Sequence, residues 1–112
     1  SEVEVVESID KRKEILKRVE SVLKSYKIQR TPENNNFYDR FMIHLNYFLD
    51  YLDRSRDDNQ SLLDMEKHIK NTYPIAFEIG SKIYEVIAQE TGVDLYKSER
   101  VYLVLHIQRL LS

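Results

Sequence analysis

Cysteine is absent from this chain of 112 residues, and glycine and proline occur only twice each. Without cysteine the chain forms neither disulfides nor thiolate sites, which fits a cytoplasmic protein. So few turn-forming residues argue against a many-turned β-sandwich and favour long helices. The longest hydrophobic runs, such as residues 101–105, are far too short to span a bilayer, and no signal peptide is visible at the start. We therefore expect a cytoplasmic all-α protein that does not contact membranes.

The residues that are present describe one ordinary folded domain. Hydrophobic residues make up 42%, charged residues 32%, and the net charge is −2, so residues 1–112 are expected to form a single domain with a modest core. Residues 10–30 carry eight Lys or Arg against three acids, and residues 33–66 carry eight acids against three Arg. Because the basic residues surround an apolar stripe, we interpret them as a solvated outer face rather than a nucleic-acid surface.

Apolar periodicity and turn residues predict a compact bundle of five helices. The expected ranges are about 8–29, 36–54, 60–71, 74–92 and 98–111, with the second and fifth helices at the centre. Pro74 suits the first turn of its helix, Gly92 ends that helix, and Ser98 is the expected cap of the last one. Gly80 costs about 1 kcal/mol relative to alanine inside a helix, which predicts a close helix crossing there.

The core is expected to form from one apolar stripe on each helix. The run from Val101 to Ile107 also has the composition of a buried strand, but its continuation to Leu111 among helical neighbours favours a helix. In the first, third and fourth helices, the side chains expected to be buried are Ile9, Leu16, Val19, Leu23, Tyr26, Leu62, Met65, Ile69, Ala76, Ile79, Gly80, Ile83 and Ile87.

Two histidines lie within the apolar stripes of the helices expected at the centre. His44 lies three residues after Phe41 and four before Phe48, and His106 lies three residues after Leu103. Each histidine is either a core residue that is hydrogen-bonded to a neighbour, the ordinary role of a lone histidine, or a functional group. Spacing alone leaves both interpretations open.

Most site chemistries lack the residues that they need. Two glycines build neither a phosphate-binding loop nor a dinucleotide-binding turn, and only Asp64 with His68 has a helical metal-ligand spacing, so neither cofactor nor metal is expected. The acid pair Asp57–Asp58 is interpreted as part of a solvated loop. An enzyme would need a further acid or base near His44, of which the sequence gives no sign. We therefore expect a protein that is not an enzyme.

Three segments in order resemble the PTS regulation domain, which occurs in sugar-operon antiterminators of the BglG/SacY type and in related transcriptional activators. The segments are YDRFMIHLNYFLDYL, LLDMEKHIKNTYPIAFEIGSKIYEVI and SERVYLVLHIQRLL, and the resemblance covers about residues 36–111. Its strongest parts are HL-x-aromatic-F at His44, IK-x-x-YP-x-A ending at Ala76, and YL-x-LHI-x-R ending at Arg109. The two histidines are 62 positions apart, which suits the family pattern.

These regulators usually carry two such domains in tandem, and this chain is more similar to the second copy. The first copy tends to have an acid before its first histidine, where Ile43 stands here. One departure is Tyr51, seven residues after His44, where the family commonly has an arginine. The residues that would replace that arginine in holding a phosphate are Arg40, Arg54 and Arg109.

The resemblance implies that His44 and His106 accept phosphoryl groups. The donors would be histidine-phosphorylated proteins of the phosphoenolpyruvate–sugar phosphotransferase system: HPr, a sugar-specific IIB component, or both. In related proteins the domain is dimeric, and the dimer equilibrium governs an attached nucleic-acid-binding module. No such module is visible in these residues, so this chain would be the sensor of such a regulator.

A physical hypothesis links this function to the apolar setting of the histidines. A neutral imidazole packs tolerably among apolar side chains, whereas a phosphorylated one brings roughly two negative charges that are costly to bury unpaired. Phosphorylation would then open the packing or lock it around nearby arginines. The alternative is a helical homodimerisation module in which both histidines are purely structural, and Tyr51 favours that alternative.

Overall fold

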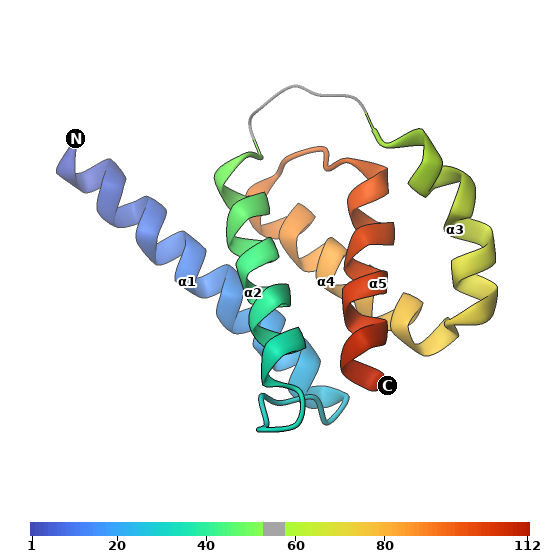
Figure 1. Cartoon of the computed structure of the whole chain (residues 1–112). Coiled ribbons are helices and arrows are strands. Elements are labelled where there is room, and N and C mark those ends of the chain that lie inside the picture. The colour runs from blue at the N-terminus through green and yellow to red at the C-terminus, as the bar shows by residue number, and fades with distance from the viewer. Residues whose placement is uncertain (53–57) are drawn as a thin grey trace.

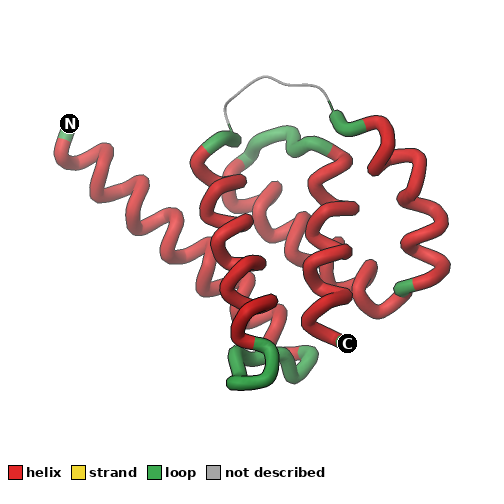
Figure 2. Tube along the Cα trace, viewed as in Figure 1, coloured by secondary structure: helices red, strands yellow, loops and turns green. Residues whose placement is uncertain are grey.

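The computed structural model describes residues 1–52 and 58–112, and every regular element within these ranges is a helix (Figures 1 and 2). The expected all-α fold is therefore confirmed. None of the helices in the described ranges has an apolar stretch long enough to cross a membrane. The elements are α1 (Glu2–Ser25), α2 (Asn35–Asp50), α3 (Gln60–Thr72), α4 (Pro74–Thr91) and α5 (Lys97–Leu111).

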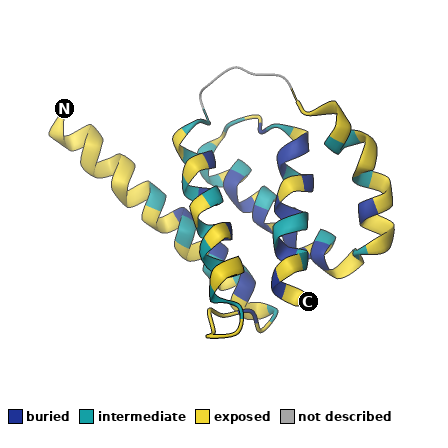
Figure 3. Ribbon diagram, in the orientation of Figure 1, coloured by how far each residue is buried: buried dark blue, intermediate teal, exposed yellow. Residues whose placement is uncertain are grey.

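Helix α5 is the structural centre of the domain. It packs against α2, α3 and α4, while α1 packs against α4. In Figure 1, α5 stands between α2 and α3, with α4 behind it and with the N-terminal half of α1 projecting away from the bundle. The expectation that α2 shares the centre was wrong: α4 is the most extensive partner of α5, and these two helices carry the largest buried sets (Figure 3).

The crossing of α4 and α5 is close because Gly80 has no side chain. A Cβ placed on Gly80 would lie 2.7 Å from Cγ2 of Val104 and 3.1 Å from its Cα and backbone nitrogen. The close crossing predicted from Gly80 is confirmed. The predicted stripe of α4 is also confirmed, because Ala76, Ile79, Gly80, Ile83 and Ile87 are all buried, together with Val86.

The boundaries of α1 differ from the expected 8–29 at both ends. The helix begins earlier, because Ser1 and Glu4 form a capping box over its first turn. It ends earlier because Lys27 has a left-handed backbone (φ 63°). The N–H of Ile28 then donates to the carbonyl of Leu23 at 2.9 Å, as in a Schellman motif.

The predicted buried stripes were wrong at two positions in the outer helices. Ile9 is 48% exposed on the projecting half of α1, and Met65 is 44% exposed on α3. Ile15, which was not among the expected residues, is buried instead. Periodicity identified the correct helices but not how far along each one the bundle extends.

The first turn of α5 is capped by Asp58, a residue from the entry of α3, rather than by Ser98. The N-cap residue is Tyr96, so the expectation that Ser98 caps the helix was wrong. Both the backbone N–H and the hydroxyl of Ser98 donate to the Asp58 carboxylate, at 3.0 and 3.1 Å, and the hydroxyl accepts from the N–H of Asn59 at 3.1 Å. Asp58 therefore does more than solvate a loop, because it joins the entry of α3 to the first turn of α5.

The end of α2 differs from the expected position, whereas the end of α4 agrees with it. Helix α2 ends at Asp50, before the expected Arg54, because the N–H of Tyr51 turns to the carbonyl of Phe48. Arg54 itself lies outside the described residues. Helix α4 is followed by Gly92 in a left-handed conformation (φ 66°), as expected for a glycine that ends a helix.

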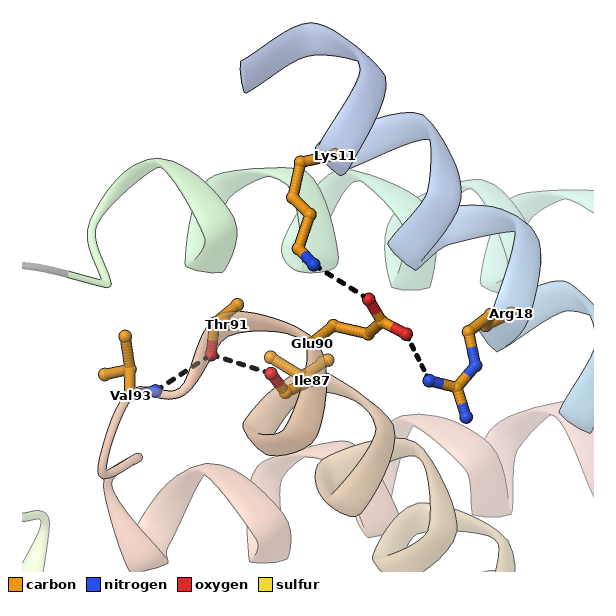
Figure 4. Close-up of polar contacts among 6 residues, drawn as sticks. All are labelled: Lys11, Arg18, Ile87, Glu90, Thr91 and Val93. Atoms are coloured by element: carbon orange, nitrogen blue, oxygen red, sulfur yellow. Dashed lines mark hydrogen bonds and ion pairs between the residues drawn. The ribbon is translucent and has the colours of Figure 1, made fainter. Parts of the chain in front are cut away.

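A carboxylate near the end of α4 attaches α1 to the bundle. Glu90 accepts from Nζ of Lys11 at 3.0 Å and also pairs with the guanidinium of Arg18 (Figure 4). Both pairs lie at the edge of the α1–α4 contact. Beside them the hydroxyl of Thr91 donates to the carbonyl of Ile87 at 2.7 Å, as Figure 4 also shows.

Candidate functional site

The two histidines singled out by the sequence lie in direct contact. His44 projects from α2 and His106 from α5, and their ring centroids are 4.9 Å apart with the planes inclined by 28°. Phe41, Leu45 and Phe48 are the buried residues of α2, and His44 lies at the edge of that stripe. Neither ring is isolated on an outer surface, because each packs against the other across the α2–α5 contact.

A tyrosine completes the group of rings. Tyr102 lies one turn before His106 on α5, and its ring stacks on that of His44 with centroids 4.5 Å apart and an angle of 13°. The Tyr102 and His106 rings are 5.2 Å apart. Three rings from two helices thus form one contact group, and stacking restrains how the His44 ring can rotate.

A buried acid is bonded to His44. Oε1 of Glu99 lies 2.5 Å from Nε2 of His44, and Glu99 is only 6% exposed. A buried carboxylate is costly unless it is paired, and this contact supplies the pairing. No sign of an acid near His44 was visible in the sequence, and the structure places Glu99 there. The available signal was that Glu99 lies three residues before Tyr102 and seven before His106, on the same face of α5.

His106 lies in a less polar setting than His44. Burial, together with the nearby His44 and Arg109, lowers the pKa of His106 to about 4. Its ring also contacts that of Phe41, with centroids 5.9 Å apart. At neutral pH the His106 imidazole is therefore uncharged and keeps a nitrogen lone pair.

The three arginines named as phosphate-pairing candidates differ in position. Arg109 lines a shallow hollow of about 170 Å³ together with Tyr102, Leu105 and His106. Arg40 is exposed on α2, one turn before His44, and Arg54 lies outside the described residues. Of the two that the structure describes, Arg109 lines a hollow together with a histidine.

Tyr51 stands where the resemblance leads one to expect an arginine. Its ring packs on that of Tyr47, with centroids 4.5 Å apart, and the neighbouring Tyr47 raises the pKa of Tyr51. An aromatic pair therefore occupies this part of α2 in place of a cation.

A hollow of about 360 Å³ opens beside His44. Its polar lining includes Asn59, Ser98 and Glu99, and its aromatic lining includes Tyr47 and Tyr102. Asp58 and Asn59 are hydrogen-bonded to Ser98 at the start of α5. The side of the hollow that includes Asn59 is therefore joined to the helix that carries His106.

Two of the aromatic side chains that line this hollow are exposed, Tyr47 at 59% and Tyr102 at 43%. On α2, one turn before Tyr47, Ile43 is 68% exposed. Large apolar side chains that gather beside a polar site are typical of a surface that another protein covers. The residues that the structure describes contain no group of three acid or histidine side chains placed to hold a metal ion, and Asp64 pairs with Gln60 at 2.9 Å.

Comparisons with known proteins agree with the resemblance drawn from the sequence. A family model described as "PRD domain" matches residues 14–110. The transcription antiterminator LacT of Lacticaseibacillus casei is 37% identical over 95 residues, which cover 84% of this chain and 32% of LacT. Protein GlcT of Staphylococcus aureus (strain JH9) is 28% identical over 93 residues, covering 83% of this chain and 32% of GlcT. The chain thus spans about a third of these relatives. No solved structure gave a significant match.

Proposed function

Because this chain belongs to the PRD domain family, we propose that it is the phosphorylatable sensor domain of a bacterial transcriptional regulator of sugar-utilisation genes. The observation that carries the proposal is the contact between His44 and His106, whose rings lie 4.9 Å apart although they come from separate helices. Two imidazoles held together at one edge of the core form a unit whose packing depends on their charge.

In this proposal each histidine accepts a phosphoryl group. A ring nitrogen of His44 or His106 attacks the phosphorus of a phosphohistidine on the donor protein, and the donor's P–N bond breaks with its electron pair returning to the donor ring. One P–N bond replaces another, so the transfer is reversible. An acceptor needs an available lone pair, and the lowered pKa of His106 keeps that ring neutral and available at cytoplasmic pH.

Phosphorylation would change the balance of charge at this site. The phosphoryl group adds roughly two negative charges. Beside His44 stands Glu99, which is 6% exposed and already negative when ionised, so repulsion is added to the cost of burying the new charge. Beside His106 stands Arg109, which could pair with a phosphate. The two positions are therefore expected to respond differently, His44 by opening the packing and His106 by forming a new ion pair.

We propose that a dimer equilibrium transmits this change. Ile43, Tyr47 and Tyr102 expose apolar surface around the histidine pair, which a second copy of the domain would cover. Allosteric couplings commonly amount to about 1–3 kcal/mol, so one phosphoryl group at the edge of such an interface is enough to shift the equilibrium. Nucleic-acid recognition would belong to a further module of the parent regulator. The donors would be phosphorylated HPr or a sugar-specific IIB component.

Phosphorylation of the purified domain tests this function. The domain is incubated with phosphoenolpyruvate, enzyme I, HPr and candidate IIB proteins, and acid-labile phosphate is detected by intact mass. We expect a mass gain in the wild type that is reduced in the His44→Ala and His106→Ala variants and lost in the double variant. His68→Ala is the matched control, because His68 is exposed on α3 and should leave the mass gain unchanged.

The solution mass of the domain with and without phosphate tests the dimer switch. An unchanged monomer in both states would contradict the proposed coupling. Phosphate that persists in the double variant would show that the acceptor residues are wrong.

A second candidate function is a helical homodimerisation module whose histidines are structural. The observation that favours it is the Glu99–His44 contact, which already pairs the imidazole in the way that a core histidine is usually paired. Absence of a mass gain with every donor, together with a stable dimer, would establish this alternative.

A further inference from the structure

The nitrogen of His44 that would accept the phosphoryl group is determined by its partner. Oε1 of Glu99 lies 2.5 Å from Nε2 of His44, a hydrogen-bonding distance. When Glu99 is ionised, its carboxylate has no hydrogen to donate, so this bond then places the hydrogen on Nε2. In a neutral imidazole one nitrogen carries the hydrogen and the other the lone pair, and the lone pair is then on Nδ1.

Two further contacts hold the ring in this orientation. Tyr102 stacks on one face of His44 at 4.5 Å, and the His106 ring stacks at 4.9 Å. Glu99 belongs to the first turn of α5 and is itself almost completely buried, so it cannot swing away without losing its hydrogen bond to His44. The stacked rings restrain the plane of the His44 imidazole, and the bond to Glu99 holds its Nε2 edge toward the protein.

We propose that Glu99 is a positioning residue that holds His44 with its hydrogen on Nε2, and that the phosphoryl group is accepted at Nδ1. This inference rests on the proposed function. In the transfer, the Nδ1 lone pair forms the new P–N bond as the donor's P–N bond breaks and its electron pair returns to the donor imidazole. The product is a phosphorylated imidazolium that keeps its hydrogen on Nε2, where the Glu99 carboxylate stabilises the positive ring.

Acceptance at Nε2 would be disfavoured by the same contact. The phosphoryl group would displace the carboxylate from its bond and stand beside it as a like charge, with Glu99 left buried and unpaired. His106 differs, because no hydrogen bond to its ring is found among residues 1–52 and 58–112. The atom that accepts phosphate is thus fixed at His44, whereas at His106 the structure leaves either nitrogen open.

The tautomer of His44 is measured first, because it requires no phosphoryl donor. Long-range ¹H–¹⁵N correlation spectra of the ¹⁵N-histidine-labelled domain show which ring nitrogens carry hydrogen, and single substitutions of the three histidines assign the signals. We expect the Nε2–H form for His44 in the wild type. A wild-type His44 protonated only on Nδ1 would overturn the proposal.

Phosphorylation of a matched pair of variants then tests the acceptor atom. Glu99→Gln keeps the size of the side chain but removes the charge, and Glu90→Gln removes a partly buried carboxylate whose ion pairs with Lys11 and Arg18 are both to α1. Because partners that orient a histidine are worth about 10- to 100-fold, we expect Glu99→Gln to slow phosphorylation of His44 by that factor. Glu90→Gln should leave the rate unchanged.

The phosphohistidine isomer of the wild type, read by ³¹P and ¹⁵N NMR, should be the Nδ1 form at His44. A phosphoryl group on Nε2, or an unchanged rate in a folded Glu99→Gln variant, would overturn the proposal. Absence of phosphate on the wild type with every donor would overturn the proposed function and the acceptor atom with it. The tautomer measurement would still decide whether Glu99 holds the ring.

Discussion

Helix α5 turns one face to α4 and another to α2, and the two faces are built from different side chains. Toward α4, Val104 packs directly on the backbone of Gly80, in an apolar crossing without room for a methyl group. Toward α2, Glu99, Tyr102 and His106 meet His44 in a group of rings and charges. The first face is close-packed and unaffected by charge, whereas the second depends on which of its atoms carry a proton or a phosphate.

This difference suggests a division of labour within one helix. The crossing with α4 holds α5 in a fixed place. Any shift of the helix would open a void or force an overlap in the core, and both lower the free energy of unfolding. The contact with α2 rests on fewer buried residues and includes titratable groups, so it is the contact that a single chemical event can change. The predictions that follow test whether stability resides in the first face and response in the second.

The largest expected effect is at the buried stripe of α4. Ile83→Ala should lower the free energy of unfolding by about 2–5 kcal/mol, because Ile83 is 0% exposed and its removal leaves a cavity. Ile75→Ala, on the same helix but 56% exposed, should cost less than about 0.5 kcal/mol. Urea unfolding measures both values. Equal costs would mean that this face does not carry the stability of the domain.

A methyl group at the crossing should have the next largest effect. Gly80→Ala would place Cβ 2.7 Å from Cγ2 of Val104. Overpacking costs about 1–3 kcal/mol, and the better helix propensity of alanine returns about 1, so we expect a net loss of up to about 2 kcal/mol. The Gly80→Ala, Val104→Ala double variant should recover part of this loss in a double-mutant cycle. Strictly additive effects would contradict the close crossing.

Acid should weaken the domain through His106. Its folded pKa, about 4, lies below the value of 6.5 for a free histidine, so the unfolded chain binds the proton more readily. Stability contributed by neutral His106 is complete above pH 6.5 and is lost as the pH falls toward 4. Since His106 is only partly buried, we expect on the order of 1 kcal/mol after allowing for solvent screening. His106→Gln should flatten this part of the pH profile; an unchanged profile would contradict the assignment.

The smallest effect is expected away from both faces of α5. Glu90→Gln removes ion pairs with Lys11 and Arg18 at the edge of the α1–α4 contact (Figure 4). Pairs of this kind contribute about 0.2–1 kcal/mol, and salt weakens them. Unfolding at low and high salt should therefore show a small loss that nearly disappears in high salt. If Glu90→Gln lowered the free energy of unfolding as much as Ile83→Ala, the α1–α4 ion pairs rather than the α4–α5 crossing would stabilise the domain.

Local periodicity predicted the helical class, the buried stripe of α4 and the Gly80 crossing. Each of these depends on residues within one or two turns of each other, which a sequence displays directly. The start of α5 shows the limit of this reasoning. Ser98 has the chemistry of a cap, yet the cap comes from Asp58, 40 residues earlier in the chain, which only tertiary packing brings near.

The histidine pair was only partly visible in the sequence. That both rings lie on apolar stripes follows from spacing, but their contact follows from the packing of α2 on α5. Glu99 was missed because a lone acid in the first turn of a helix is usually explained by the helix dipole. Its partner stands 55 residues away, so the spacing along α5 places Glu99 on the face that carries His106 but does not show that His44 lies opposite.

Hydrogen exchange before and after phosphorylation tests the division between the two faces most directly. The unphosphorylated and phosphorylated domains are compared amide by amide. We expect the changes in protection to concentrate in α2 and along the α5 turn that carries His106, while the α4 amides from Ile79 to Ile87 keep their protection. Equal changes in α2 and α4, or no change in α2 on a domain that carries phosphate at His44 or His106, would contradict this account.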